Sequence, residues 1–80
     1  MEEAELTKIK GKIKFVENFA DYNVEITEIM PDLKVKIVEH LFNREGEWKI
    51  VDSMPDIKIK IVENFGDFSI QFVNNFPGVL

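Results

Sequence analysis

Short stretches of alternating apolar and polar residues recur along the chain at a spacing of 11 residues. The clearest pair is Lys12–Asp21, which reads KIKFVENFAD, and Lys58–Asp67, which reads KIKIVENFGD. Four further copies begin at residues 23, 34, 47 and 69, and two extra residues fall in the loop-like segment NREG at 43–46. Alternation with a period of two is typical of a strand with one face in a core and one in water. The pattern therefore predicts one strand of about five or six residues in each copy.

Two positions of the repeat are apolar in every copy and define the predicted core. The second position is filled by Ile13, Val24, Val35, Trp48, Ile59 and Ile70, and the fourth by Phe15, Ile26, Ile37, Ile50, Ile61 and Phe72. The residue just before a copy is also apolar wherever the register is unbroken: Tyr22, Leu33, Ile57 and Phe68. Because these positions are two residues apart, they share one face of each strand, and we expect them to lie inside.

The second half of each copy carries turn residues. Pro31, Pro55 and Pro77 cannot donate to a ladder, and the Asp or Gly that follows each suits a tight turn. The eighth position, just before the proline or its counterpart, is apolar in every copy: Phe19, Met30, Leu41, Met54, Phe65 and Phe76. We expect each of these residues to point back into the core as a plug.

Length and composition fit a single all-β domain of six to seven short strands. A chain of 80 residues supports one core at most. Ile and Val together number 18, against 4 Leu and 2 Ala, and β-branched residues favour strands. The units must share a core, as in a small β-barrel or sandwich or a short β-solenoid. We expect residues 12–80 to form this domain and residues 1–11 to be a polar, flexible leader.

The repeats resemble the septoil-knot domain family. The shared motif is Lys-x-Lys-hydrophobic-Val-Glu/Asp-Asn/Ser-Phe/Met-Pro-Asp, with one tryptophan-bearing copy after a short insertion, and it extends from Lys12 to Leu80. The resemblance implies a deeply knotted backbone, a torus knot with seven crossings, and no established biochemical activity. Some copies depart from the motif, most clearly where Ala20 and Gly66 replace proline and where Phe42 and Asn43 replace Pro-Asp.

Composition also narrows the classes of function. The absence of cysteine excludes a disulfide framework, thiol catalysis and Cys-ligated metal sites. A net charge of −5 argues against default nucleic-acid binding. No apolar run is long enough for a membrane span, and the acidic start of the chain does not resemble a secretory signal. We expect a cytoplasmic monomer with no cofactor and no membrane partner, and a protein partner is compatible with this composition.

Two acidic columns invite chemical hypotheses. Asp21, Asp32, Asp56 and Asp67 could form a ladder of calcium ligands, but calcium needs six or more oxygens at one point, and we interpret this column as turn-capping. Glu17, Glu28, Glu39, Asp52 and Glu63 could supply the paired carboxylates of glycoside chemistry. Short turns leave little material for a cleft, so we interpret this second column as solvated strand ends.

Other reactive groups are sparse. His40 is the only histidine and stands at a polar turn position, so neither a Ser-His-Asp triad nor a two-histidine metal site can form. Trp48 could be an exposed stacking platform, but its register places it in the core. We therefore predict no catalytic, cofactor-binding or metal-binding residue and expect the protein not to be an enzyme.

Outward-facing lysines are the main surface feature. The candidate anion-contact residues are Lys12, Lys14, Lys34, Lys36, Lys49, Lys58 and Lys60. If their strands are neighbours, they form a basic stripe on an acidic protein. The alternative is that outward lysines simply keep the strands from pairing with foreign edges. The sequence thus favours a robust, non-enzymatic interaction or structural module, and the alternative function is contact with an anion or nucleic acid through these lysines.

Overall fold

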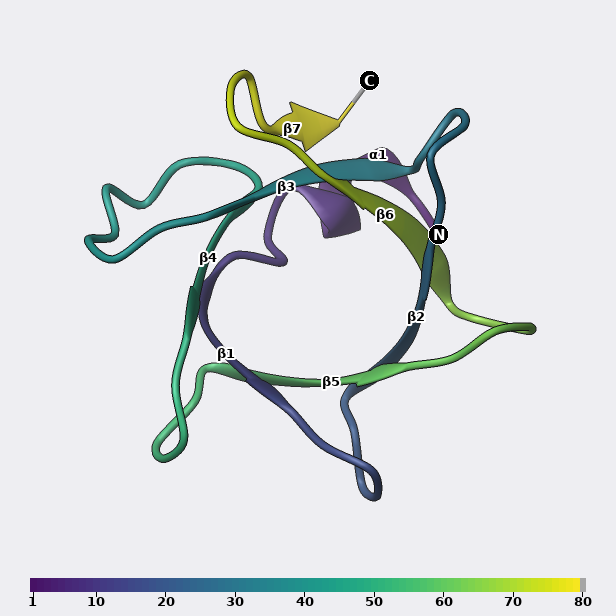
Figure 1. Ribbon diagram of the computed structural model, residues 1–80, viewed down its shortest axis with the longest axis horizontal. Coiled ribbons are helices and arrows are strands. Elements are labelled where there is room, and N and C mark those ends of the chain that lie inside the picture. The colour runs from purple at the N-terminus through teal and green to yellow at the C-terminus, as the bar shows by residue number, and fades with distance from the viewer. Residues whose placement is uncertain (80) are drawn as a thin grey trace.

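A computed structural model describes residues 1–79 and shows a nearly all-β chain (Figure 1). Each of the six copies contains one strand of four or five residues. A single helical turn precedes the first of these strands, and a short seventh strand follows the sixth. The elements are α1 (Glu3–Leu6), β1 (Gly11–Phe15), β2 (Tyr22–Ile26), β3 (Leu33–Ile37), β4 (Glu47–Ile50), β5 (Ile57–Ile61), β6 (Phe68–Phe72) and β7 (Gly78–Val79).

The first six strands close into a barrel in which all neighbours are parallel. The order around the ring is β4-β1-β5-β2-β6-β3, and β3 pairs back onto β4 to complete it. Figure 1 looks down through this ring, and β7 adds an antiparallel pairing on β3. Because the strands are parallel, all six begin at one end of the barrel, the entry end, and finish at the other, the exit end.

Most connections pass over a neighbouring strand on the way to the next one. On its way from β1 to β2 the chain crosses β5, and on its way from β4 to β5 it crosses β1. A strand of five residues rises about 16 Å, and the six residues at 16–21 can span that distance at about 3.3 Å each without a helix. The connections project outward from the ring as fingers (Figure 1).

Aspartates extend the hydrogen-bonded ladder at the entry end. The backbone N–H of Asp56 donates to the Lys12 carbonyl at 2.8 Å, while the Lys12 N–H donates to Asp56 Oδ2 at 2.9 Å. The same two-way clamp joins Asp21 to Lys58, Asp67 to Asn23 and Asp32 to Ser69. Gly11 has a φ of 105°, and a Cβ there would lie 2.6 Å from Asp56 Oδ2, so this clamp needs glycine.

The centre of the barrel is filled as the alternation predicts. All six second-position residues, Ile13, Val24, Val35, Trp48, Ile59 and Ile70, are fully buried. Leu33 and Phe68 are buried above them, and Tyr22 and Ile57 pack against the same cluster. The prediction that Trp48 belongs to the core is confirmed, and its Nε1 donates to the Ile9 carbonyl at 2.9 Å.

The fourth position is only half inside, which corrects the prediction of full burial. Its residues are 39–51% exposed: Phe15, Ile26, Ile37, Ile50, Ile61 and Phe72. They share the inward face with the second position, but each lies at the last residue of its strand. Their exposure is therefore at the exit end, and we name these six residues the exit ring.

The predicted plugs are wrong, because most eighth-position side chains point into solvent. Phe19, Met30, Met54, Phe65 and Phe76 are 84–96% exposed. All five have φ between 46° and 62°, a left-handed conformation that turns the side chain away from the barrel. In the third copy the positive φ moves to Asn43, and Phe42 is the exposed apolar residue. We name Phe19, Met30, Phe42, Met54, Phe65 and Phe76 the fingertips.

Part of the leader belongs to the core, contrary to the expectation of a wholly polar and flexible segment. Leu6 and Ile9 are 3% and 1% exposed and join the central cluster. Their separation of three residues places both on one side of the turn formed by α1 and the residues after it. Two apolar residues are too few to give a periodic signal, which is why the pattern missed them. Together with Trp48, they cover the entry end.

Candidate functional site

Three surfaces of the molecule carry the candidate chemistry: a crevice at the entry end, a group of lysines on the barrel wall, and the exit end with its fingers. No helix in the described part of the chain is long and apolar enough to cross a membrane. Residues 1–79 also contain no group of three or more side chains placed to hold a metal ion.

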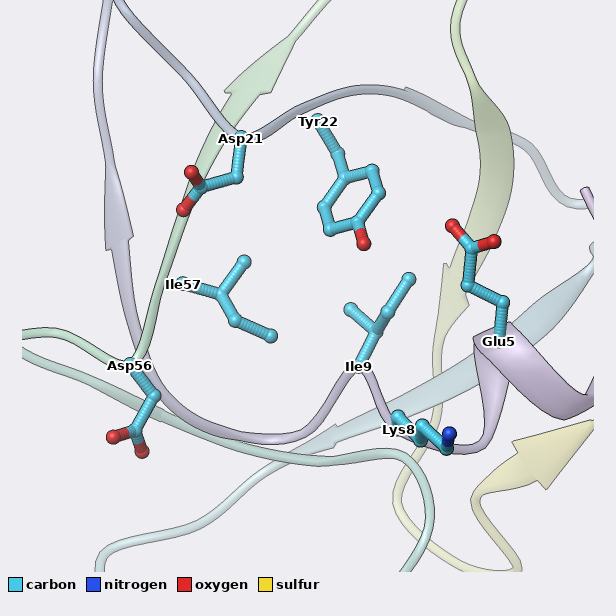
Figure 2. A pocket seen from close by; sticks show the side chains of 7 residues that line it. All are labelled: Glu5, Lys8, Ile9, Asp21, Tyr22, Asp56 and Ile57. Atoms are coloured by element: carbon cyan, nitrogen blue, oxygen red, sulfur yellow. The ribbon is translucent and has the colours of Figure 1, made fainter.

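The entry-end crevice has a volume of about 430 Å³ and lies between the leader and two strand entries. Figure 2 shows the Tyr22 ring pointing into it, with Glu5 on one side and Ile57 on the other. Burial raises the pKa of the Tyr22 phenol above its ordinary value, and the carboxylates of Glu5 and Asp21 raise it further. The phenol therefore stays protonated at neutral pH, where it can donate a hydrogen bond but cannot act as a base.

The other carboxylates of the crevice are already engaged in the fold. Asp21 accepts the Lys58 N–H and Asp56 accepts the Lys12 N–H. The aspartate column is thus spread over four strand entries, one clamp at each, and each side chain bonds to another strand 37 or 44 residues away, so the predicted capping of the local turn is replaced by clamping between strands. Its members do not converge as calcium ligands would.

The second acidic column lies at the exit end. Glu17, Glu28, Glu39, Asp52 and Glu63 occupy the sixth position of five copies, and all are exposed. The last ladder hydrogen bond of each strand is made one residue earlier, as when the Val16 N–H donates to the Ile59 carbonyl at 2.9 Å. These five residues therefore stand just beyond the exit ring, and we name them the acidic rim. Their exposure gives none of them the dry surroundings that a general acid needs.

The structure brings five of the seven candidate lysines together. On the neighbouring strands β4, β1 and β5, Lys49 lies opposite Lys12, and Lys14 lies opposite Lys58. Lys60 lies two residues after Lys58 on β5 and is opposite Asn23 of β2. We name Lys12, Lys14, Lys49, Lys58 and Lys60 the lysine face. Like charges placed directly opposite each other destabilise a sheet, so this arrangement costs stability.

The remaining two lysines lie on β3, which pairs with β4 and so borders the lysine face. Lys36 is opposite Glu47, and Lys34 is opposite Gln71. Glu47 is 5% exposed, and its Oε1 accepts the Phe42 N–H at 3.0 Å. The seven lysines therefore do not form one uniform stripe. All seven lysines lie on the four contiguous strands β3, β4, β1 and β5, whereas β2 and β6 carry Asn23, Glu25, Ser69 and Gln71 at the equivalent positions.

The fingertips and the exit ring are the surface that the sequence analysis placed wrongly. The exit ring and the fingertips together expose twelve large apolar side chains on a small molecule. A signal for the fingertips existed in segments such as Asn18-Phe19-Ala20, where one apolar residue stands inside a very short turn. A turn that short cannot both reverse the chain and return its side chain to the core.

Comparison with known proteins agrees with this architecture. A search of curated proteins finds no match to the chain. A family model described as the 7(1) septoil knot domain matches residues 6–80, which includes Leu6 and Ile9 of the leader as well as all seven strands. The chain therefore belongs to the septoil knot domain family.

Proposed function

We propose that this protein is a small, non-enzymatic interaction module that presents apolar fingertips on a rigid barrel. The observation that carries the proposal is the combination of exposure and backbone strain at five of the six fingertips. Phe19 and Phe65 are 94% and 96% exposed, with φ of 59° and 62°. A left-handed conformation costs a non-glycine residue about 1–2 kcal/mol, and an exposed ring returns no burial energy.

Asparagine or glycine would suit these turns better, since both accept positive φ and neither exposes an apolar surface. The fingertips therefore do not serve the stability of the isolated chain. Strained residues of this kind accumulate at sites of binding and recognition. Contact with a partner would supply the burial that the isolated molecule lacks.

The test compares Phe19→Asn/Phe65→Asn with the wild type in cross-linked capture from cell extract. We expect a partner that binds the wild type and is lost with this variant, while the variant folds at least as stably. Ile29→Asn is the matched control, because Ile29 is 78% exposed but has no positive φ. A capture profile that is the same for the wild type and the double variant would refute the role of the fingertips.

We also propose that the backbone is knotted as the family description implies, and that the knot gives resistance to unfolding. Connections that pass over intervening strands support this winding, as when the chain passes β5 between β1 and β2. Slow, cooperative unfolding and survival of residues 12–80 in protease are the expected results. Rapid proteolysis within the strands, or gradual melting, would contradict the proposal.

Contact with anions through the lysine face is the second candidate function. The specific observation is the retention of Lys12 beside Lys49 and of Lys14 beside Lys58, despite their mutual repulsion. The test is titration with a polyanion such as heparin at two salt concentrations. Affinity should fall with salt and with Lys12→Gln/Lys14→Gln, whereas Lys34→Gln/Lys36→Gln should matter less. Salt-independent binding, or equal effects of both variants, would refute it.

A further inference from the structure

The exit end presents an apolar surface inside a charged border. The six residues of the exit ring face the barrel axis and are 39–51% exposed. Each exit-ring residue lies opposite a buried second-position residue of a neighbouring strand, as Phe15 lies opposite Ile59, so the six exposed side chains are diagonal neighbours around the ring. A surface of this kind, on the order of a few hundred Å², is the size of patch that often marks a binding site on a monomer.

The border has one sign of charge. Five of the six sixth-position residues are acidic, and the sixth copy has Asn74 there. The sixth position follows the last ladder hydrogen bond of each strand by one residue, so the acidic rim stands just beyond the exit ring, where the chain bends. An apolar centre with a carboxylate rim favours a ligand that is apolar in the middle and positively charged at its edges.

The molecule itself shows what kind of segment covers an end of this barrel. At the entry end, Leu6 and Ile9 bury two apolar side chains that are three residues apart. Lys8 lines the crevice together with Glu5, Asp21 and Asp56, and Lys10 Nζ donates to the Asn43 carbonyl at 3.1 Å. The segment that covers this end is therefore amphipathic, with charges of both signs: Glu2, Glu3 and Glu5 as well as Lys8 and Lys10.

We propose that the exit end binds a cationic amphipathic segment of a protein partner. Two or three apolar side chains at helical spacing would cover the exit ring, and lysines or arginines would lie over the acidic rim. A second copy of this chain fits less well, because two acidic rims would face each other in an end-to-end dimer. An anionic lipid surface would be repelled for the same reason. This inference deepens the proposed interaction role and rests on it, but it uses the exit ring and the acidic rim and not the fingertips.

The experiment uses a 12-residue peptide of leucine and lysine, with leucines at helical spacing, and a second peptide in which glutamate replaces lysine. Binding to the full chain is measured by calorimetry and mapped by NMR shifts of the Ile26, Ile37, Ile50 and Ile61 methyl groups. We expect the lysine peptide to bind and to shift these methyl groups, and the glutamate peptide not to bind. Binding of both peptides, binding of neither, or shifts at the entry end instead would overturn the proposal.

Variants of the rim separate specific docking from general attraction to an acidic protein. Glu17→Gln/Glu28→Gln should weaken binding of the lysine peptide about three- to tenfold, as expected for two exposed ion pairs. Glu2→Gln/Glu3→Gln changes the net charge equally at exposed leader positions and should have little effect. Equal losses in both variants would refute the rim as a binding element.

Two further measurements identify other occupants of the exit end. Concentration-dependent dimers in sedimentation that shift the same methyl groups would replace the proposal with self-association. Binding to anionic vesicles through these groups would replace it with a lipid surface. Failure of the peptide while Phe19→Asn/Phe65→Asn still abolishes partner capture would remove this inference and leave the proposed function standing.

Discussion

The entry end and the exit end of the barrel are made by the same six strands, yet they finish in opposite ways. At the entry end, aspartate clamps extend the ladder, and Leu6 and Ile9 cover the last apolar layer, in which Leu33 and Phe68 are buried and Tyr22 and Ile57 are partly buried. At the exit end, the corresponding layer is half exposed, and the chain leaves through strained, apolar fingers. The same repeat can therefore close a core at one end and present a surface at the other.

Stability and interaction are divided between the two ends of this very small domain. An end that is sealed by the chain itself contributes burial energy to folding. An end left open gives up that energy and keeps a surface with which a partner can make contact. Substitutions at equivalent depths of the two ends should therefore differ in their effect on the free energy of unfolding.

The largest effect is expected from Trp48→Ala, at the boundary between the core and the entry end. Trp48 is fully buried and its Nε1 bonds to the Ile9 carbonyl, so the variant loses packing and leaves a buried acceptor without its donor. We expect a loss of about 3–5 kcal/mol in the free energy of unfolding, measured by denaturant titration. A loss below about 1 kcal/mol would show that the indole does not hold the leader onto the barrel.

The most direct comparison of the two ends pairs Ile9→Ala with Ile61→Ala. Ile9 is 1% exposed and Ile61 is 40% exposed, although both are isoleucines at an end of the barrel. Ile9→Ala should cost about 2–4 kcal/mol and Ile61→Ala about 1–2 kcal/mol, because half-exposed atoms lose less on truncation. Equal costs, measured under the same denaturant conditions, would contradict the distinction between a sealed and an open end.

The alternation of the repeat predicted the central layer but could not predict how either end finishes. Ile13 and Trp48 sit at a position that is apolar in every copy, and a period of two is enough to place them inside. The parallel closure of the ring depends on pairings such as Ile13 with Ile57, which lie far apart in the chain. No local pattern specifies such pairings, so the sequence left a barrel, a sandwich and a solenoid open.

The misplaced residues have a common physical cause, which is the choice of backbone conformation in short segments. Phe65 is apolar and follows a strand, so burial was the natural expectation, yet its positive φ points it outward. Leu6 and Ile9 belong to a leader dominated by charged residues, and their burial depends on where the leader docks. Neither residue propensity nor alternation predicts the sign of φ in a short turn or the place where the leader docks. The exit end was therefore the part of the candidate site least accessible from sequence.

A third comparison uses two aspartates at opposite ends of one finger. Asp56 clamps the entry of β1 through hydrogen bonds in both directions with Lys12, whereas Asp52 is an exposed member of the acidic rim. Asp56→Ala should lower the free energy of unfolding by about 1–2 kcal/mol, and Asp52→Ala by less than about 0.5 kcal/mol. Thermal unfolding of the two variants side by side measures the difference. If Asp52→Ala proves as costly as Asp56→Ala, the rim has a structural role.

The entry end should also respond to alkaline pH through Tyr22. Burial, and then Glu5 and Asp21, raise the pKa of its phenol above the ordinary value of 10.0. Folding therefore favours the protonated phenol, so its contribution to stability is complete below about pH 10 and is lost as pH rises through the folded-state pKa. Tyr22 is the only tyrosine, so absorbance of the phenolate reports this site alone.

The expected titration midpoint of Tyr22 lies above 10.0. Glu5→Gln should lower this midpoint but leave it above the ordinary value of 10.0, since burial is the largest cause of the raised pKa. Tyr22→Phe should show a smaller loss of stability above pH 10 than the wild type. A midpoint at or below the ordinary value would show that the leader does not cover Tyr22 in solution. The exit end contains no tyrosine, so this measurement tests the sealed end alone.

The smallest change in stability is expected at the fingers, where Phe65→Asn should leave the fold as stable as the wild type or stabilise it by up to about 1 kcal/mol. Asparagine accepts the φ of 62° more readily than phenylalanine, and a side chain that is 96% exposed has almost no packing to lose. Denaturant titration of Phe65→Asn beside Phe68→Ala gives the contrast, because Phe68 is 2% exposed at the entry end and should cost about 3–5 kcal/mol. A loss of more than about 1 kcal/mol in Phe65→Asn would mean that the finger packs against the barrel in solution. A gain in stability together with loss of a captured partner would indicate that the strained phenylalanine is retained for binding, because stability alone would favour asparagine.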